Sequence, residues 1–405
     1  MRTGEAMEER MEQELGEFRA ETRSWLEENC PPGARGSGQI PFGSSKIKLE
    51  DDVQLWLDRM AQRGWTVPTW PEVYGGAALE RPQYTILIDE LKRLNARTPL
   101  TGRGVNYIGP TILELGSDAQ KSRWLPGIAR GEGAWAMGYS EPGAGSDLAS
   151  LAMRAVLDGD HYVLNGRKTW TSDAMDCDYI FVLVRTDPDK PKHEGISLIL
   201  VDMAQPGIQV RPIRLLSGAS PFAETLFEDA IATADDIIGG VNNGWTVGKR
   251  LLQFERSTHA GINISGSQGG RAVKSRVPEK IQRYLPRKNG RIADPALRAR
   301  LINFEMNGHA QRLTQRRAIE ELQTRAPGFT SSAVKLTNAL QVQEGDELLL
   351  EAMGSQGLGA AGAGFSEDEL AATRAWLYQK SLTIAGGTKE VQLNIIAKRV
   401  LGLPD

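Results

Sequence analysis

The sequence predicts an α+β fold with three domains: a helical N-terminal domain (1–133), an antiparallel β middle domain (134–244) and a C-terminal helical bundle (245–405). Two changes in the hydrophobic pattern carry this prediction. Apolar residues recur at helical spacing before residue 134 and after residue 244, and β-branched runs separated by turn residues lie between. Strands without intervening helices favour a small antiparallel barrel or sandwich over alternating parallel units.

The N-terminal domain is expected to begin with an amphipathic helix over residues 8–29, where apolar side chains alternate with charged ones at near-helical spacing. The Pro- and Gly-rich stretch 31–45 predicts a loop. Further helices should run from about residue 50 to 130, and we expect prolines to break them, at Pro71, Pro82 and Pro110.

The middle domain should contain strands at residues 152–157, 161–164, 179–184, 196–201 and 208–215. Two turn sequences, Asp158-Gly159-Asp160 and Asn165-Gly166, are expected to separate neighbouring strands.

In the C-terminal domain, helices are expected over residues 245–266, 298–324, 336–353 and 366–382. Ser366 and Glu369 predict a capping box, and Thr388 predicts the N-cap of a last helix that stops near Gly402. Residues 357–362 match the dinucleotide pattern GxGxxG, but a helical pattern precedes them. A loop between helices is therefore the better interpretation.

Composition excludes several classes of function. The net charge of -3 and the dispersed basic residues give no reason to expect nucleic acid as a partner, and no apolar run approaches a membrane span. The histidines lack paired spacing, so we expect no metal site. Cys30 and Cys177 lie far apart and are interpreted as two buried or incidental thiols. The N-terminus lacks the pattern of a secretory signal, so a cytoplasmic location is expected.

The strongest local signal is the segment 139–147, Tyr-Ser-Glu-Pro-Gly-Ala-Gly-Ser-Asp. It reads as a strand that enters a Gly-rich turn with hydroxyls and backbone amides. Such a turn can bind the edge of a heterocycle or a phosphate, because glycine lets the backbone approach closely. Composition alone would favour the alternative of an ordinary turn rich in Ser and Asp.

This segment resembles the signature of the acyl-CoA dehydrogenases that holds the flavin pyrimidine. In the same order, residues 165–172 resemble the family's second flavin segment, and residues 383–388 with the closing helix resemble its C-terminal signature. The chain is identified as a member of this family. The resemblance implies the acyl-CoA dehydrogenase-like fold, noncovalent FAD, an acyl-CoA substrate and an electron-transfer flavoprotein as acceptor. It also implies a homodimer or homotetramer, with a heteromer as an alternative.

The resemblance assigns a set of residues to FAD: Met137, Tyr139, Ser140, Gly145, Ser146, Trp170, Thr171, Ser172, Thr388 and Glu390. Trp170 would cover the isoalloxazine and exclude water beside the hydride path, although a core anchor is the alternative for a lone tryptophan. The substrate residues implied are Ser146, Arg256 and Gly386.

The expected base departs from the usual family pattern. Most members carry a catalytic Glu two residues before the C-terminal signature Thr, and this chain has Gly386 there. A subset of the family places the base in a Glu-Arg pair on a helix, which Glu255 and Arg256 match. The resemblance therefore implies Glu255 as the base, against the alternative of a solvated or salt-bridged helix Glu. Gly386 would keep the backbone N–H that bonds the thioester carbonyl and would widen the pocket.

Two further departures concern the FAD pyrophosphate. The family's Arg-x-x-Phe-Gly segment is not recognisable around residues 281–286, and a family Gln is replaced by Glu351, a carboxylate that would repel a diphosphate unless bridged. Two other functions therefore stay open. One is an oxidase or monooxygenase of the same fold acting on a substrate without CoA, and the other is a non-catalytic subunit of a heteromeric dehydrogenase.

Overall fold

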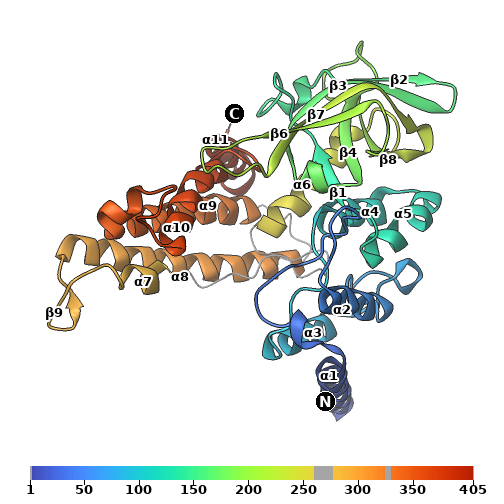
Figure 1. Cartoon of the computed structure of the whole chain (residues 1–405). Helices are drawn as coiled ribbons and strands as arrows, with labels where there is room; N and C mark the ends of the chain where they lie inside the picture. Colours follow the sequence, from blue (N-terminus) through green and yellow to red (C-terminus); the bar gives the residue numbers. More distant parts are fainter. Residues whose placement is uncertain (1, 260–276, 324–329, 405) are drawn as a thin grey trace. The chain divides into compact units, whose positions relative to one another are not determined.

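The computed structural model describes residues 2–259, 277–323 and 330–404 (Figure 1). The chain divides into two compact units, one with the N-terminal helices and the β-sheet, the other with the C-terminal helices and residues 213–221. The order of the elements along the chain, with helices first, then strands and then helices again, confirms the predicted fold class. Because the N-terminal helices and the sheet share one unit, the domain boundaries at 133 and 244 stay predictions.

The N-terminal helices of the first unit follow the predicted pattern. They are α1 (Arg2–Asn29), α2 (Asp51–Gln62), α3 (Arg81–Arg93), α4 (Gly109–Leu115) and α5 (Asp118–Arg130), with short turns η1 (Pro32–Ala34), η2 (Glu72–Tyr74) and the π-turn η3 (Gly104–Ile108). Pro82 and Pro110 lie in the first turns of α3 and α4, so they start these helices instead of breaking them. The first turn needs no N–H from proline, which explains the difference from expectation.

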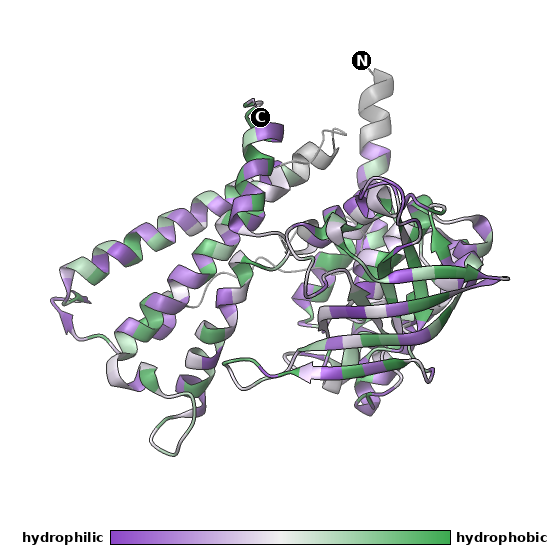
Figure 2. Ribbon diagram, turned by 90° about the horizontal axis from the view of Figure 1, so that it is seen from above, coloured by the Kyte–Doolittle hydropathy of each residue, from purple (hydrophilic) through white to green (hydrophobic). Residues whose placement is uncertain are grey.

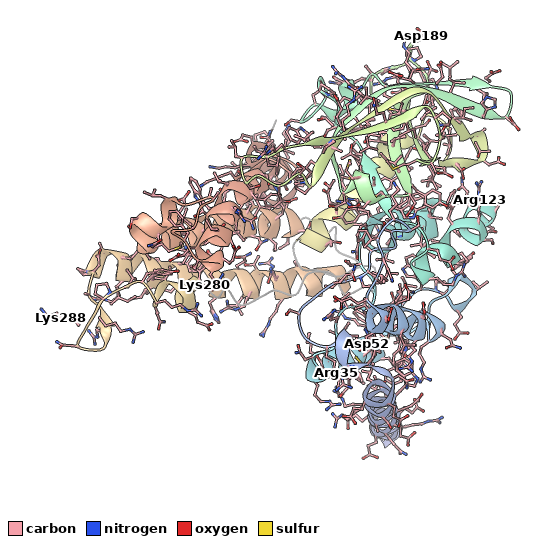
Figure 3. All side chains as sticks on the ribbon, in the orientation of Figure 1. Arg35, Asp52, Arg123, Asp189, Lys280 and Lys288 are labelled. Carbon is pink, nitrogen blue, oxygen red and sulfur yellow. The ribbon has the colours of Figure 1, made fainter. Side chains whose placement is uncertain are left out.

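The loop over residues 31–45 is anchored where it leaves α1. The N–H of Gly33 donates to Asp52 Oδ2 at 2.6 Å, and Arg35 donates to the carbonyl of Cys30 at 2.8 Å. Figure 3 labels the side chains of Arg35 and Asp52. Cys30 and Cys177 are both buried free thiols, as predicted. Burial raises the pKa of the Cys177 thiol to about 12, which keeps it protonated and unreactive.

Helix α1 is fixed to α3 by a buried carboxylate. Glu90 is 1% exposed and accepts hydrogen bonds from Arg19, Arg23 and Arg93 at 3.0, 2.9 and 2.7 Å. The hydrogen bond from Arg23 is the largest of the effects that lower the pKa of Glu90 to about 2. A carboxylate whose folded-state pKa is depressed contributes stability above its unfolded pKa, and this contribution is lost as the pH falls toward 2.

We expect Glu90→Gln to lower the free energy of unfolding by about 2 kcal/mol at neutral pH. The deficit relative to wild type should shrink as the pH falls from about 4.5 toward 2, because the wild-type carboxylate then becomes protonated. Urea titrations of both proteins at several pH values measure this deficit. The exposed pair of Arg10 and Glu14 supplies the control, since Glu14→Gln should change stability by less than about 0.5 kcal/mol. A deficit that does not vary with pH would contradict the account.

The β-sheet of the first unit has the order β6-β7-β3-β2-β4-β5-β8, with β1 paired to β4. Its strands are β1 (Trp135–Gly138), β2 (Arg154–Asp158), β3 (His161–Ser172), β4 (Tyr179–Arg185), β5 (Ile196–Asp202), β6 (Ile208–Ile213), β7 (Phe222–Thr233) and β8 (Ile237–Ile238). The pairs β2–β3, β3–β7, β4–β5 and β5–β8 are antiparallel, and the pairs β1–β4 and β2–β4 are parallel. Buried and more accessible residues alternate along most of β3 and β7, whereas β4 and β5 are buried over almost their whole length. Figure 2 shows that hydrophobic and hydrophilic residues both occur along the strands of the sheet.

The expectation that Asn165-Gly166 forms a turn between strands is wrong. Both residues lie inside β3, at a register shift against β7. Gly166 has a φ of +147°, and a Cβ there would lie 2.9 Å from the Cα of Met153. The glycine therefore serves a bulge and a close approach to Met153. Because β3 continues past this bulge, it carries residues 170–172 within the sheet.

In the second unit, a helix lies in each predicted range, and the sequence did not predict the short helix at 277–281 or the hairpin at 287–292. The elements of this unit are the end of α6 (Gly244–His259), α7 (Val277–Ile281), α8 (Pro295–Gln323), α9 (Thr330–Met353), α10 (Glu367–Gln379) and α11 (Lys389–Ile395), with the hairpin β9 (Arg287–Lys288) and β10 (Arg291–Ile292) and the turns η7 (Gly354–Leu358), η8 (Lys380–Thr383) and the π-turn η9 (Ile396–Val400). The predicted ends at residues 266 and 324 lie outside the described residues. Apolar residues of α7, α8, α9 and α10 form the core of this unit.

The predicted helix caps are confirmed. Ser366 and Glu369 form a reciprocal capping box at α10, and the Thr388 hydroxyl accepts from the N–H of Val391 at 3.2 Å. Residues 357–362 follow helix α9 and not a strand, which confirms that the GxGxxG match is a loop between helices. Among the described residues, no helix combines the length and apolar character needed to cross a membrane.

Candidate active site

The first flavin segment runs from β1 into a tight turn. Met137 is half-buried in β1, and the Tyr139 ring is buried, with its centroid 6.2 Å from that of Phe181. The turn closes through two hydrogen bonds of 3.0 Å between the backbones of Glu141 and Ala144. Side chains added at Gly143 or Gly145 would meet no atom within 4 Å. The turn thus presents open backbone, with Gly145 and Ser146 exposed, to anything that binds there.

Trp170 lies in an unusual backbone conformation at the end of β3. Its φ is +60°, and it falls at a second register shift of β3, between Lys168 and Thr171. A bulky residue at positive φ is a conformational outlier, and such strain is concentrated at functional sites. The indole is 55% exposed, which is not the position of a core anchor. The bulge therefore leaves a flat aromatic face accessible in the first unit.

The residues after Trp170 differ in accessibility. Thr171 is fully buried, and its hydroxyl has no hydrogen-bond partner within the described part of the chain. Ser172 is half-buried. The next residue, Asp173, has a φ of +56° and accepts from Arg103 at 3.1 Å, which holds this end of the segment. Ser172 can therefore offer its hydroxyl to a ligand more readily than Thr171.

The two segments lie side by side in the first unit. The N–H of Thr169 donates to the carbonyl of Ser140 at 2.9 Å. An ion pair between Lys168 and Glu141 also links the two segments. The sequence did not predict these two residues as part of the site. A lysine at an inward position of a strand is the signal that could have identified Lys168, because buried lysines are rare unless paired.

Polar side chains of the second unit donate hydrogen bonds to backbone carbonyls in and next to the C-terminal signature. Gln392 donates to the carbonyl of Gly386 at 3.0 Å, and Lys335 donates to the carbonyls of Gly387 and Leu382 at 2.6 and 3.1 Å. The φ of Gly386 is +65°. This left-handed backbone favours glycine and would strain a glutamate, which gives a reason for Gly386 independent of pocket width. Thr388 is half-buried and Glu390 is exposed.

Glu255 lies near the end of α6 and is 6% exposed, so it is not a solvated helix carboxylate. Its Oε2 atom is buried without a hydrogen-bond partner in the described ranges. Buried polar atoms are nearly always satisfied, and an exception calls for a functional explanation. The side chain of Arg256 lies outside the described residues, so its predicted contact with substrate stays a prediction.

Glu351 is paired with Arg300, which would offset its negative charge toward a diphosphate. Arg300 donates to both carboxylate oxygens of Glu351, at 2.9 and 2.6 Å. Within the described residues, no group of three or more His, Cys, Asp or Glu side chains is placed to hold a metal ion.

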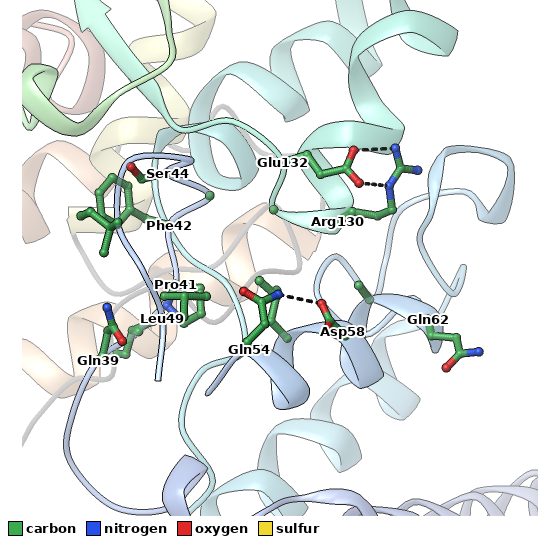
Figure 4. Close-up of a pocket in the computed structure, with 16 residues that line it drawn as sticks. Gln39, Pro41, Phe42, Ser44, Leu49, Gln54, Asp58, Gln62, Arg130 and Glu132 are labelled. Carbon is green, nitrogen blue, oxygen red and sulfur yellow. Dashed lines mark hydrogen bonds and ion pairs between the residues drawn. The ribbon is translucent and has the colours of Figure 1, made fainter. Parts of the chain in front are cut away.

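A separate cavity of about 650 Å³ lies in the first unit, between residues 39–49, α2 and the end of α5 (Figure 4). Its polar lining includes the ion pair of Arg130 and Glu132 at 2.7 Å and the hydrogen bond from Gln54 to Asp58 at 2.8 Å. None of the predicted site residues lines it.

The chain is matched by family models in three consecutive parts. The N-terminal domain of acyl-CoA dehydrogenase matches residues 12–132, the middle domain 136–230 and the C-terminal domain 242–401. Among curated proteins, the acyl-CoA dehydrogenase IpdE1 of Mycobacterium tuberculosis is 35% identical over 392 residues, 97% of this chain and 98% of the relative.

Solved structures agree with these matches. The structure titled Tcur3481-Tcur3483 steroid ACAD, G363A variant, has a TM-score of 0.74 at 30% identity and covers 97% of this chain and 99% of its own. The ChsE4-ChsE5 complex from Mycobacterium tuberculosis has a TM-score of 0.71 at 28% identity, with coverage of 97% and 98%.

Proposed function

Since this chain belongs to the acyl-CoA dehydrogenase family, we propose that it uses FAD to oxidise the α,β-bond of an acyl-CoA thioester and passes the electrons to an electron-transfer flavoprotein. That the chain is an oxidoreductase of this family is established by its matches. The observation that carries the cofactor proposal is Trp170, an exposed indole held at positive φ and joined by the Thr169–Ser140 hydrogen bond to the open glycine turn. A flat heterocycle with polar edges suits such a surface.

When bound, FAD accepts the β-hydrogen of the substrate as a hydride. The chain's own residues then have three tasks. Glu255 takes the α-hydrogen as a proton, so that the electron pair left behind forms the new double bond. The N–H of Gly386 donates to the thioester oxygen as negative charge develops there. Trp170 keeps water away from the reacting carbons.

The proposal assigns the base to the α6 position and so places the chain in the family subset with the Glu-Arg pair. Burial of Glu255 supports this assignment, and so does the lack of a hydrogen-bond partner for its Oε2 atom among the described residues. The left-handed φ of Gly386 supports it too, because a glutamate base at that position would be strained.

We propose that the chain assembles into an oligomer, either a homodimer or homotetramer or a heteromer. On α8, three large apolar side chains are exposed along one face at intervals of four and seven residues: Ile302, Met306 and Leu313. An exposed apolar row of this kind is typical of a helix that packs against another chain. Two of the similar structures carry two protein names in their titles, which supports the heteromeric form.

A non-catalytic subunit of a heteromer is the second candidate. The glycine at position 386 and the unrecognised Arg segment around 281–286 favour it. It predicts a chain that folds and assembles without a functional FAD site of its own.

We expect the purified protein to hold one FAD per active site, noncovalently. The absorbance spectrum, read before and after incubation with excess FAD and removal of free cofactor, measures the stoichiometry. Acid precipitation should release the flavin into the supernatant. Protein without flavin absorbance after this reconstitution would reject the proposal in favour of the non-catalytic subunit.

A further inference from the structure

Lys168 is fully buried in β3 of the first unit, at the edge of the bulge that carries Trp170. Its Nζ atom donates to Glu141 Oε1 at 2.8 Å and to the carbonyl of Tyr139 at 3.2 Å. The stem of the lysine passes over Gly138, where an added Cβ would lie 3.1 Å from Lys168 Cγ. Lys168 of the second flavin segment is thus joined to the first segment by hydrogen bonds and an ion pair.

The carboxylate of Glu141 accepts from two backbone groups as well. The N–H of Ala152 donates to Oε2 at 2.7 Å, and the N–H of Met153 donates to Oε1 at 3.0 Å. Its side chain is only 9% exposed. The ion pair therefore joins three stretches of chain: the exit of β1, the approach to β2, and β3.

Stability alone is a weak explanation for this pair. Removing two charges from water costs several kcal/mol, and replacing a buried ion pair by apolar residues is often neutral or stabilising. Burial lowers the pKa of Lys168 to about 8, against the opposing effect of Glu141, which shows the cost of desolvating the ammonium. What an ion pair supplies and an apolar pair does not is fixed geometry between particular atoms.

We propose that Lys168 and Glu141 are positioning residues for FAD. They set the turn of residues 139–147 against the Trp170 bulge, so that the open backbone and the indole face are in place before the cofactor arrives. The Thr169–Ser140 hydrogen bond lies between the two anchor points and shares this task. This inference rests on the proposed function, because it takes the two segments to be the flavin-binding surface.

The test compares three proteins. They are wild type, a double variant that combines Lys168→Met and Glu141→Gln, and the control variant Arg167→Met. Arg167 is the neighbouring cation of β3, but its side chain is 58% exposed and its distance to Glu224 is 3.4 Å. Each protein is stripped of flavin, its unfolding by urea is measured, and FAD is titrated by quenching of flavin fluorescence.

We expect the double variant to bind FAD at least roughly tenfold more weakly, because site geometry must be held within about 0.5 Å, and to lose less in folding stability than in FAD affinity. The absorbance bands of its remaining bound FAD should shift. Arg167→Met should change none of these quantities. If the double variant does not fold, Glu141→Asp keeps the charge and both carboxylate oxygens but shortens the side chain by one methylene, and it should weaken FAD binding by roughly three- to tenfold.

Wild-type FAD affinity and an unshifted spectrum in the double variant would overturn the inference and leave the proposed function standing. So would a loss of affinity matched by an equal loss of folding stability, which is the result of a purely structural pair. Failure of the wild-type protein itself to bind FAD would overturn the proposed function and this inference together.

Discussion

Glu255→Gln is expected to slow reduction of the flavin by substrate by roughly 10²–10⁴-fold. The amide keeps the shape of the side chain and removes its basicity, so the α-proton has no acceptor. FAD content and thioester binding should be unchanged, because the amide has nearly the same volume as the carboxylate and keeps one of its two oxygens. Stopped-flow mixing under anaerobic conditions, with the true substrate in excess, measures the rate.

Glu305→Gln is the matched control for this prediction, since Glu305 is an exposed helix glutamate of the second unit. It should reduce its flavin at the wild-type rate. If Glu255→Gln is as fast as wild type, Glu255 is not the base. A carboxylate elsewhere, on this chain or on a partner subunit, would then have to be sought.

Trp170→Ala is expected to weaken FAD binding by about 1–2 kcal/mol, roughly five- to thirtyfold, and to shift the flavin absorbance bands. The alanine variant lacks the exposed indole face on which the flavin would stack. Trp170→Phe keeps an aromatic face and should lie between alanine and wild type. Titration of the flavin-free proteins with FAD gives the three affinities.

A comparison of Trp170→Gly with Trp170→Ala distinguishes the effect of the backbone conformation at position 170 from the effect of the indole. Glycine adopts a φ of +60° without strain, so Trp170→Gly should be more stable than Trp170→Ala by about 1 kcal/mol while binding FAD equally weakly. Unchanged cofactor affinity and spectrum in both variants would show that the indole does not contact the flavin.

The sequence predicts those features that depend on neighbours along the chain. The capping box of Ser366 and Glu369 and the N-cap Thr388 could be identified because their partners are three residues away. Pro82 and Pro110 show the ambiguity of local signals, because a proline that ends one helix also starts another. Gly166 predicts a turn but lies in a bulge, and the two are hard to distinguish in sequence because both place glycine at positive φ.

Features made by contacts distant in sequence could not be predicted. Lys168 and Glu141 are joined across the sheet, and no spacing rule connects them. Strand β7 was missed although it pairs with β3 along most of its length, because its charged residues interrupt the apolar pattern. The motif located Trp170, but its positive φ follows from the register between β3 and β7. Burial of Glu255 likewise depends on packing that helix periodicity does not define.

The central claim is that this chain oxidises an acyl-CoA thioester with its own FAD. Its most direct test is anaerobic mixing of the FAD-loaded protein with a panel of CoA thioesters of linear, branched and steroid-derived acids. The steroid-derived member is included because a similar structure is titled a steroid ACAD. We predict that at least one thioester bleaches the visible absorbance of the oxidised flavin and yields its α,β-unsaturated product in equal amount. Full flavin loading with no bleaching by any thioester, but bleaching by the same acids without CoA, would contradict the claim and favour an oxidase or monooxygenase of this fold.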